Sequence, residues 1–400
     1  METTDSSLPP SLRIALVCPF SLSRPGGVQG QVLGLARALP ELGHKATVFA
    51  PLDDAGDAPD GIELVATGHS VSLPSNGSIA PVALSVRAVR RALRELQSSG
   101  FDVVHVHEPF TPGLPYGLLL GRNVPPLVAT FHRSGGSPLY RVLGSLARRS
   151  AHRLVVRAAV SEAARATASD ALGGTYEVGF NGVEVDQYQG VEPWPTDRPT
   201  LLFLGRHEER KGLRTLLDAF GELRRDLPDP TADATRSRSG RPVLWIAGDG
   251  PLTKSLRRLH PPSADIEWLG VLPEGEKVRR LVAADAVCAP SLGGESFGMV
   301  LLEAMAARTV VVASDIEGYR AAAGGHAVLT PPADRWTLAD ALAGVLEGRL
   351  AVLGDPGTAR GTAREQWLEA AAGRADRWSM VRLAQWYEGL YHTAMVRPRA

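Results

Sequence analysis

Short apolar runs alternate with amphipathic segments along most of the chain. In its first half the pattern predicts strands and one early helix, at 13–18, 45–50, 102–107, 126–131 and 157–160, and at 28–39. After residue 191 it restarts, with strands at 201–205, 243–247, 266–269, 286–289 and 310–313 and helices over 213–225 and 300–307. Buried strands separated by amphipathic helices are typical of doubly wound parallel sheets. Two such series predict an α/β protein of two Rossmann-like domains that face a central cleft.

The same pattern gives the expected domain limits. A length of 400 residues fits two domains, since single cores rarely grow beyond about 250–300 residues. We expect a disordered tail over 1–11, an N-terminal domain over 12–190, a C-terminal domain over 191–375 and a final helix over 376–400 that crosses back to the first domain. The aromatic residues of that helix recur at helical spacing, which favours packing over ligand binding.

One interval interrupts the second series. Residues 228–242 are rich in Asp, Pro, Thr, Ser and Arg. This composition predicts an exposed, flexible insertion. A basic contact site is the alternative interpretation.

Composition narrows the class of protein. Hydrophobic residues make up 44% and charged residues 22%, and the formal net charge is zero, so no global field favours nucleic acid as a partner. The two cysteines, Cys18 and Cys288, lie in apolar runs, which predicts buried reduced thiols and a cytoplasmic protein. No apolar run approaches the roughly 20 residues that span a bilayer, and the first residues lack the pattern of a signal peptide.

The segment 293–303 carries the strongest chemical signal. Gly293-Gly294-Glu295-Ser296-Phe297-Gly298 follows an apolar strand and precedes a helix, so Glu295 is predicted in the turn and Glu303 about two turns into the helix. Free backbone N–H groups near Ser296 to Gly298 would seat a phosphate. A carboxylate on each side of a phosphate seat suits a sugar nucleotide, whose hydroxyls flank a diphosphate.

Basic residues follow the first strand of the second series. Arg206 and Lys211 can neutralise a diphosphate and stabilise the charge that develops when a glycosidic bond breaks. A solvated charge cluster is the alternative. The glycines of Pro25-Gly26-Gly27 allow a close backbone approach to a ligand. Asp249, in Gly248-Asp249-Gly250, is expected beside a nucleotide base, although this tripeptide also makes ordinary turns.

A basic helix is predicted over 82–97, after Asn76-Gly77-Ser78. Its apolar stripe, Val86, Val89, Leu93 and Leu96, lies beside a cationic stripe of Arg87, Arg90, Arg91 and Arg94. Such a helix can lie on an anionic membrane surface, where each basic residue contributes about 1 kcal/mol. The alternative is a Rossmann helix whose apolar stripe packs on the sheet and whose arginines are solvated.

The motifs together resemble one family. The 293–298 turn with Glu303 resembles the E-x7-E signature of retaining GT-B glycosyltransferases of family 4, and Gly205 to Gly212 resembles its arginine–lysine clamp. Pro25 to Val28 resembles its N-terminal glycine loop. Cys18-Pro19-Phe20-Ser21, His105-Val106-His107-Glu108-Pro109 and Ala129-Thr130-Phe131-His132 are similar to the actinobacterial members that move mannose from GDP-mannose to phosphatidyl-myo-inositol.

The resemblance implies roles for the residues that match. The catalytic group would be His132, Arg206, Lys211 and Glu295. The donor would be held by Gly26, Gly27, Arg206, Lys211, Asp249, Glu295, Ser296, Phe297, Gly298 and Glu303, with Glu303 on the ribose hydroxyls. The acceptor lipid would be held by Gln29, Asn76 and Ser78. The protein would lie on the inner face of the plasma membrane, held there by the arginine helix.

No metal is expected. His105 and His107 alternate on a strand without acidic or cysteine partners at ligand spacing. The resemblance implies that the arginine–lysine pair takes the role of a divalent ion, so the donor would need no metal cofactor.

Two residues depart from the lipid-linked pattern, and other functions stay open. Ser75 stands where a tyrosine is usual and Pro81 where a basic residue is usual, so another acceptor is an alternative. A transferase of the same fold that uses UDP-glucose or UDP-N-acetylglucosamine, and a non-enzymatic sugar-nucleotide sensor, are the rival hypotheses. An NAD enzyme is disfavoured because Pro-Gly-Gly-Val replaces G-x-G-x-x-G.

Overall fold

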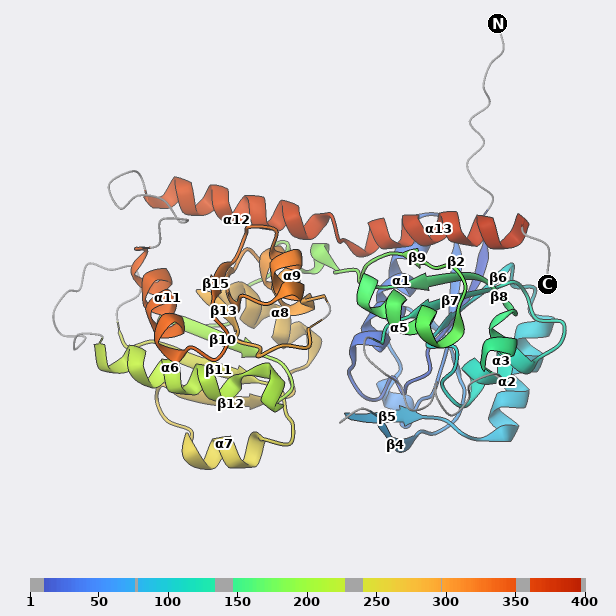
Figure 1. Ribbon diagram of the computed structural model, residues 1–400, viewed down its shortest axis with the longest axis horizontal. Coiled ribbons are helices and arrows are strands. Elements are labelled where there is room, and N and C mark those ends of the chain that lie inside the picture. The colour runs from blue at the N-terminus through green and yellow to red at the C-terminus, as the bar shows by residue number, and fades with distance from the viewer. Residues whose placement is uncertain are drawn as a thin grey trace, which may run out of the picture. The chain divides into compact units, whose positions relative to one another are not determined.

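The computed structural model describes residues 11–75, 78–133, 147–226, 240–295, 297–349 and 360–396. They fall into two units. Unit 1 contains the chain up to Gly182 and the segment from Met380 onward, and unit 2 runs from Val183 to Ser379. Each unit is built around an open parallel sheet with helices packed against it (Figure 1).

The sheet of unit 1 has the order β3-β2-β1-β6-β7-β8-β9 in the described residues. Its strands are β1 (Arg13–Val17), β2 (Lys45–Ala50), β3 (Glu63–Ala66), β6 (Val103–His107), β7 (Leu127–Phe131), β8 (Leu154–Ala159) and β9 (Glu177–Val178). The helices are α1 (Gly27–Glu41), α2 (Val86–Ser98), α3 (Leu114–Leu120), α5 (Glu162–Leu172) and α13 (Met380–Val396), with a short 3-10 turn η1 (Ala55–Asp57).

The continuous apolar runs of these strands explain their central place. Ile14 of β1 pairs with Ala46 on one side and Val103 on the other, and β6 is buried along its whole length. Strands buried on both faces need helices on both faces. One face packs on α2, α3 and α5, and the other on α1 and α13.

The sheet of unit 2 has the order β12-β11-β10-β13-β14-β15 in the described residues. Its strands are β10 (Thr200–Leu204), β11 (Val243–Ala247), β12 (Ile266–Gly270), β13 (Ala286–Ala289), β14 (Val310–Ser314) and β15 (Val328–Thr330). The helical elements are η2 (Val185–Tyr188), η3 (Glu209–Lys211), α6 (Leu213–Asp226), α7 (Thr253–Leu259), α8 (Glu274–Ala283), α9 (Met299–Ala306), α10 (Glu317–Ala323), α11 (Arg335–Glu347) and α12 (Arg360–Asp376). The predicted fold, two Rossmann-like parallel-sheet units, is confirmed.

The limits of the units differ from the expected 190/191 and 375/376. Val183 and Tyr188 are buried in the core of unit 2, and the Val183 N–H donates to the Trp378 carbonyl at 2.8 Å. The first crossing segment therefore joins unit 2 at Val183, and the last leaves it after Ser379. From Met380 on, α13 packs along α1, with Leu383, Tyr387 and Tyr391 buried in unit 1.

A hairpin stands where the basic helix was predicted to begin. β4 (Val71–Ser75) pairs antiparallel with β5 (Ser78–Val82), and α2 starts only at Val86. Val82 pairs with Val71 in the hairpin, and Ser85 caps α2 by accepting a hydrogen bond from the Ala88 N–H. The helix is therefore shorter at its start than the predicted 82–97.

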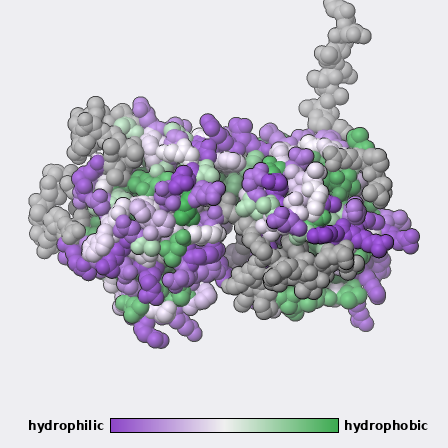
Figure 2. Space-filling model, in the orientation of Figure 1, coloured by the Kyte–Doolittle hydropathy of each residue, from purple (hydrophilic) through white to green (hydrophobic). Residues whose placement is uncertain are grey.

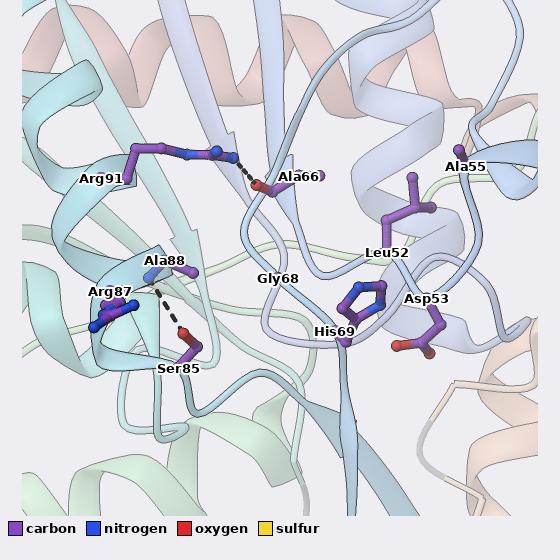
Figure 3. A pocket seen from close by; sticks show the side chains of 10 residues that line it. All are labelled: Leu52, Asp53, Ala55, Ala66, Gly68, His69, Ser85, Arg87, Ala88 and Arg91. Carbon is purple, nitrogen blue, oxygen red and sulfur yellow. Dashed lines mark hydrogen bonds between the residues drawn. The ribbon is translucent and has the colours of Figure 1, made fainter.

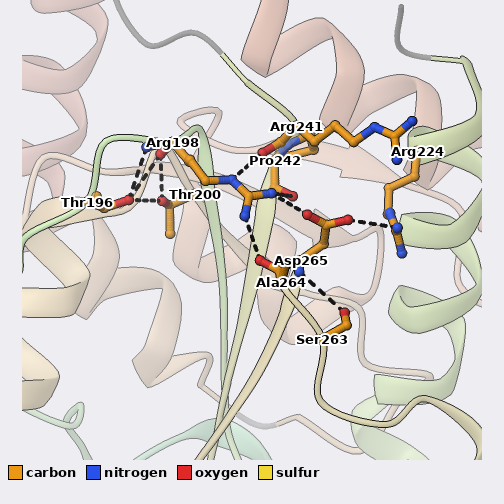
Figure 4. A network of polar contacts seen from close by, with 9 residues as sticks. All are labelled: Thr196, Arg198, Thr200, Arg224, Arg241, Pro242, Ser263, Ala264 and Asp265. Carbon is orange, nitrogen blue, oxygen red and sulfur yellow. Dashed lines mark hydrogen bonds and ion pairs between the residues drawn. The ribbon is translucent and has the colours of Figure 1, made fainter. Parts of the chain in front are cut away.

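An arginine joins the segments that enter three strands of unit 2 (Figure 4). Arg198, just before β10, donates to the carbonyl oxygens of Arg241 at 2.7 Å and Ala264 at 2.5 Å, and pairs with Asp265. Asp265 also pairs with Arg224 of α6 at 2.7 Å. These contacts tie the amino ends of β10, β11 and β12 together. The predicted insertion 228–242 lies outside the described residues up to residue 239.

Both cysteines are buried and form no disulfide, as predicted. Burial raises the pKa of the Cys18 thiol to about 12 and raises that of Cys288 as well. Thiols in such surroundings are inert.

Candidate functional site

Glycines bring three loops of unit 2 together at the carboxyl edge of its sheet. A Cβ on Gly248, after β11, would lie 2.0 Å from the carbonyl oxygen of Gly205, after β10. A Cβ on Gly212 would lie 1.9 Å from the carbonyl oxygen of Pro290, after β13. Both glycines have positive φ, so only glycine fits at either position. The loop that carries Arg206 to Lys211 is thereby held against the loop that carries Glu295.

Five charged side chains of these loops form one network. Lys211 Nζ lies 2.7 Å from Glu295 Oε1, and Arg210 Nη1 lies 2.5 Å from the same oxygen. Glu208 accepts from Arg210 Nε at 3.1 Å and from Arg206 Nε at 2.6 Å. The structure therefore brings Lys211 and Glu295 into direct contact, while Arg206 connects to them through Glu208 and Arg210.

The network is anionic inside and cationic outside. The side chains of Glu295 and Glu208 are 12% and 17% exposed, whereas those of Arg206 and Arg210 are 50% and 45% exposed. Burial alone would raise the pKa of Glu208, but the hydrogen bonds and charges of Arg206 and Arg210 hold it below its ordinary value. Three cations against two carboxylates leave an excess of positive charge that faces solvent.

Glu303 belongs to a second cluster. Lys277 of α8 lies 3.3 Å from Glu303 and 2.7 Å from Glu274. Burial raises the pKa of the Glu303 carboxyl, and Lys277 opposes that rise. α9 begins at Met299 after Gly298 in the left-handed region, so Glu303 lies in the second turn, not the expected two turns in.

The other predicted donor residues of unit 2 have local partners. Asp249 accepts from Thr253 Oγ1 at 2.6 Å, which holds the pKa of its carboxyl below the ordinary value. Phe297 packs edge-on against Trp378, with ring centroids 5.4 Å apart. A Cβ on Gly298 would meet the Tyr319 ring at 3.0 Å. Ser296 lies outside the described residues.

In unit 1 the glycine loop is closed by Gln29. Gly26 is the N-cap of α1, and a Cβ there would lie 2.4 Å from Gln29 Oε1. Gln29 is buried, and its Nε2 donates to the carbonyl oxygens of Ser21 and Arg24 at 3.3 and 3.1 Å. Gly27, in contrast, has open space around its Cβ position. Gln29 thus shapes the loop before α1 with the amide that was expected to meet the acceptor.

The histidines of unit 1 form a ladder with α13. His105 Nδ1 lies 2.9 Å from Tyr391 Oη and its Nε2 lies 2.7 Å from Thr130 Oγ1, which in turn lies 2.8 Å from Tyr387 Oη. His107 stacks on His105 and meets His132 at 2.8 Å. Burial lowers the pKa of His105 to about 3 and that of His132 to about 4, and lowers that of His107 as well. The aromatic stripe of α13 packs, as the spacing predicted.

Glu108 fixes the backbone beside His132. Its Oε1 accepts from the N–H groups of His132 and Arg133 at 2.6 and 2.9 Å. Glu108 itself adopts a φ of 48°, which is uncommon for a residue with a Cβ. Burial raises the pKa of its carboxyl against these hydrogen bonds.

The four arginines of α2 are all exposed, while its apolar stripe is not free. Ala92 and Leu96 are buried, and Val89 and Leu93 pack against the same core. At the start of the helix Val86 is 61% exposed, and the preceding Leu84 is 44% exposed. Val89, Leu93 and Leu96 of the stripe that was expected either to meet a membrane or to pack on the sheet therefore pack in unit 1, whereas Val86 does not. Figure 2 shows hydrophobic surface beside hydrophilic side chains at the lower edge of this unit.

A pocket of about 490 Å³ lies beside the start of α2 (Figure 3). Arg87 and Arg91 line it with His69 and Asp53, and Arg91 Nη2 is fixed by the Ala66 carbonyl oxygen at 3.2 Å. The Asp53 carboxylate accepts from Ser21 and from Ser70. The pocket therefore combines two guanidinium groups with a carboxylate that already has partners.

Some predicted features cannot be placed. Asn76 lies outside the described residues, and of Ser78 only the backbone, paired in β5, is described. Within the described ranges no group of three or more His, Cys, Asp or Glu could hold a metal ion. In the same ranges no helix has both the length and the apolarity of a bilayer-spanning segment.

Two open parallel sheets in succession, with a cation–carboxylate cluster at the carboxyl edge of the second, match the architecture of the GT-B glycosyltransferases. The sequence model of the family described as Glycosyltransferase Family 4 matches residues 25–187. The sequence model described as Glycosyl transferases group 1 matches residues 198–348. A solved glycosyltransferase of Rickettsia africae has a TM-score of 0.68 over 97% of this chain and 100% of that one, at 16% identity. This likeness shows the fold.

Relatives of closer sequence extend over nearly the whole chain. It is 36% identical over 385 residues to the phosphatidyl-myo-inositol mannosyltransferase of Mycobacterium tuberculosis, covering 92% of this chain and 94% of that protein. It is 37% identical over 343 residues to the protein of the same name from Mycolicibacterium smegmatis, covering 84% and 85%. The chain therefore belongs to glycosyltransferase family 4, and it is a glycosyltransferase.

Sequence reasoning missed several members of these clusters. Glu208, which joins Arg206 to Arg210, was hidden in a run of charges, and Lys277 gave no signal because its partner Glu303 is distant in sequence. The alternation of His105 and His107 did indicate a shared face. Nothing in the sequence predicted their link to Tyr391.

Proposed function

We propose that this chain is a retaining mannosyltransferase that moves mannose from GDP-mannose to phosphatidyl-myo-inositol at the cytoplasmic face of the membrane. One observation carries the proposal: Lys211, Arg210 and Glu295 converge in a chain that is 36% identical, over nearly its whole length, to proteins named for this acceptor and this sugar. The family shows a glycosyltransferase, and the proposed donor and acceptor specify which substrates it uses.

The donor is assigned to unit 2. The N–H groups of Arg206 and Lys211 suit the oxygens of a diphosphate, because guanidinium and ammonium groups form short charge-assisted hydrogen bonds to phosphate. The same cations stabilise the nucleoside diphosphate as it leaves, so no divalent metal is required. Glu295 accepts from hydroxyls of the mannose and Glu303 from those of the ribose.

The acceptor is assigned to unit 1. His132 contacts a hydroxyl of the transferred sugar. The glycine loop that Gln29 shapes binds the inositol headgroup. The packed apolar stripe of α2 supports a specific mode of membrane contact: the arginine face of the helix meets anionic headgroups without insertion of the helix. Each arginine near the surface contributes about 1 kcal/mol.

Radiolabelled GDP-mannose and phosphatidylinositol vesicles test the proposal. We expect labelled mannose in the lipid fraction, with the α-configuration of the donor kept in the product. Glu295→Gln lowers the transfer about 100-fold, while Glu209→Gln, an exposed neighbour in η3, leaves it intact. Labelled lipid from UDP-glucose or UDP-N-acetylglucosamine, but not from GDP-mannose, would overturn the donor assignment.

The membrane mode has its own test. Replacing Arg90 and Arg94 by glutamine lowers co-sedimentation with vesicles that contain phosphatidylinositol, and raised salt does the same to the wild type. Binding to neutral phosphatidylcholine vesicles stays weak in both. Equal binding of wild type and variant to anionic vesicles would exclude α2 as the contact.

A further inference from the structure

Two histidines of unit 1 share a partly buried hydrogen bond. His107 Nδ1 lies 2.8 Å from His132 Nε2, and the rings are nearly parallel, with an interplanar angle of 24°. His107 comes from the end of β6 and His132 follows the end of β7, the neighbouring strand. The register of the parallel sheet therefore sets this pair.

The lower part of the ladder holds His107 in place. His105 has partners at both ring nitrogens, Tyr391 at 2.9 Å and Thr130 at 2.7 Å. The His107 ring stacks on it with centroids 4.3 Å apart. The His107 ring is fully buried and stacks on a His105 ring that is itself held in place, so it has little freedom to rotate. His107 therefore presents Nδ1 to His132 in a defined direction.

The hydrogen bond between the two histidines restricts which ring nitrogen of each carries a proton. Both imidazoles are neutral near pH 7, because burial lowers both pKa values, so each ring has one N–H and one lone pair. Either His107 donates from Nδ1 or His132 donates from Nε2. In the second case the His107 proton would sit on Nε2.

The surroundings of His107 Nε2 decide between the two. This atom is buried and has no hydrogen-bond partner among the described residues. A buried N–H group without an acceptor is rare, and leaving a buried donor unsatisfied costs about 1–3 kcal/mol. An N–H on His107 Nε2 is therefore the less favourable arrangement.

We propose that His107 is a positioning residue: it donates from Nδ1 to His132 Nε2 and thereby keeps the proton of His132 on Nδ1. This rests on the proposed function, in which His132 contacts a hydroxyl of the transferred sugar. With Nε2 occupied by His107, His132 meets that hydroxyl as a neutral donor through Nδ1–H. Glu108 completes the arrangement by fixing the backbone N–H groups of His132 and Arg133.

Nitrogen NMR of the histidine rings tests the tautomer directly. The signals of His132 are assigned by their loss in His132→Asn. We expect a protonated Nδ1 and a bare Nε2 in the wild type, and a proton shared between both nitrogens in His107→Phe. A protonated Nε2 in the wild type, or a His132 spectrum unchanged in a folded His107→Phe, would overturn the proposal.

Kinetics test the consequence. His107→Phe keeps the aromatic stack but lowers kcat about 100-fold with little change in the KM for the donor, as expected for a misplaced group. His107→Asn places an amide nitrogen where Nδ1 lies and recovers most of the rate. His152→Asn, the same exchange at an exposed histidine of unit 1, changes nothing.

The outcomes separate the two proposals. A wild-type rate in folded His107→Phe would overturn the positioning role while leaving the proposed function intact. Absence of transfer by the wild type from any sugar nucleotide would overturn the proposed function, and the nitrogen spectra would still decide the tautomer.

Discussion

The two units carry polar networks of opposite character. In unit 1 the ladder from Tyr391 to His132 is neutral, and His105, His107 and Thr130 have no exposed surface. In unit 2 the network from Arg206 to Glu295 is charged, and its arginines are about half exposed. Both networks lie where parallel strands end, but one is buried and neutral and the other is charged and partly exposed.

Energetics separate the networks. A buried polar group that loses its partner costs about 1–3 kcal/mol, whereas an exposed ion pair contributes about 0–1 kcal/mol. The ladder therefore stabilises unit 1 and fixes one geometry. The exposed cations contribute little to folding and can exchange their carboxylate partners for phosphate oxygens. Substitutions in unit 2 should then change activity with little loss of stability, whereas loss of a hydrogen bond inside the ladder should also lower stability.

The largest effect is expected from Glu295→Ala. The substitution removes the carboxylate that accepts from Lys211 and Arg210, and with it the proposed contact to the sugar. We expect transfer to fall about 100- to 1000-fold, the range for loss of a preorganised polar group. Single-turnover transfer of labelled mannose measures this, with thermal unfolding as the check of folding.

Arg214→Ala is the matched control, because Arg214 is exposed on α6 next to the same loop. The transfer rate and the thermal unfolding midpoint of Arg214→Ala should equal those of the wild type. If Glu295→Ala instead lowered the unfolding midpoint strongly and kept its rate, the contrast between the units would be reversed.

Thr130→Val should break the ladder. It leaves His105 Nε2 and Tyr387 Oη without their shared partner, so the free energy of unfolding falls by about 1–3 kcal/mol. Urea unfolding measures the loss. Thr393→Val, in which the lost hydroxyl donates to the carbonyl oxygen of Gly389 one turn earlier in α13, is the control. Equal stability of the two variants would show that the ladder contributes nothing to stability.

Acid should weaken unit 1 through the same histidines. Their pKa is lowered in the fold, to about 3 for His105 and about 4 for His132, from an ordinary 6.5. The unfolded chain binds protons that the folded one excludes, so stability is fully present above pH 6.5 and is lost as pH falls toward 4. Unfolding midpoints measured between pH 7 and 4 should decline. A flat profile would contradict buried neutral rings.

Chelation should have the smallest effect. In the proposed function the cations of unit 2 take the charge of the leaving diphosphate, so transfer in excess EDTA should equal that in Mg²⁺. A rate restored only by a divalent ion would show that Arg206 and Lys211 do not suffice.

The sequence predicted the fold well because local signals and burial agreed. The apolar runs of β1, β6, β10 and β13 and the glycine turn before α9 are local patterns, and each lies where it was expected. The hairpin of β4 and β5 was missed, although Asn76-Gly77 between β-formers is a hairpin signal. The apolar and basic stripes at helical spacing after residue 82 led to the prediction of a helix alone in this region.

The site was predicted only in part. The contact between Lys211 and Glu295 joins residues that two motifs had marked, and Glu303 was marked by the same spacing. Lys277, Tyr387 and Tyr391 reach their partners through tertiary packing over long stretches of chain. No local pattern encodes such contacts, which explains why the ladder emerged only from the structure.

Calorimetric titration with GDP-mannose tests the central claim, that the cations of unit 2 bind the diphosphate of a sugar nucleotide. The wild type should bind, and Lys211→Ala should bind about 10- to 100-fold more weakly, the loss expected for one charge-assisted hydrogen bond. His107→Phe, in unit 1, should keep most of the affinity. Equal dissociation constants for the wild type and Lys211→Ala would contradict the account.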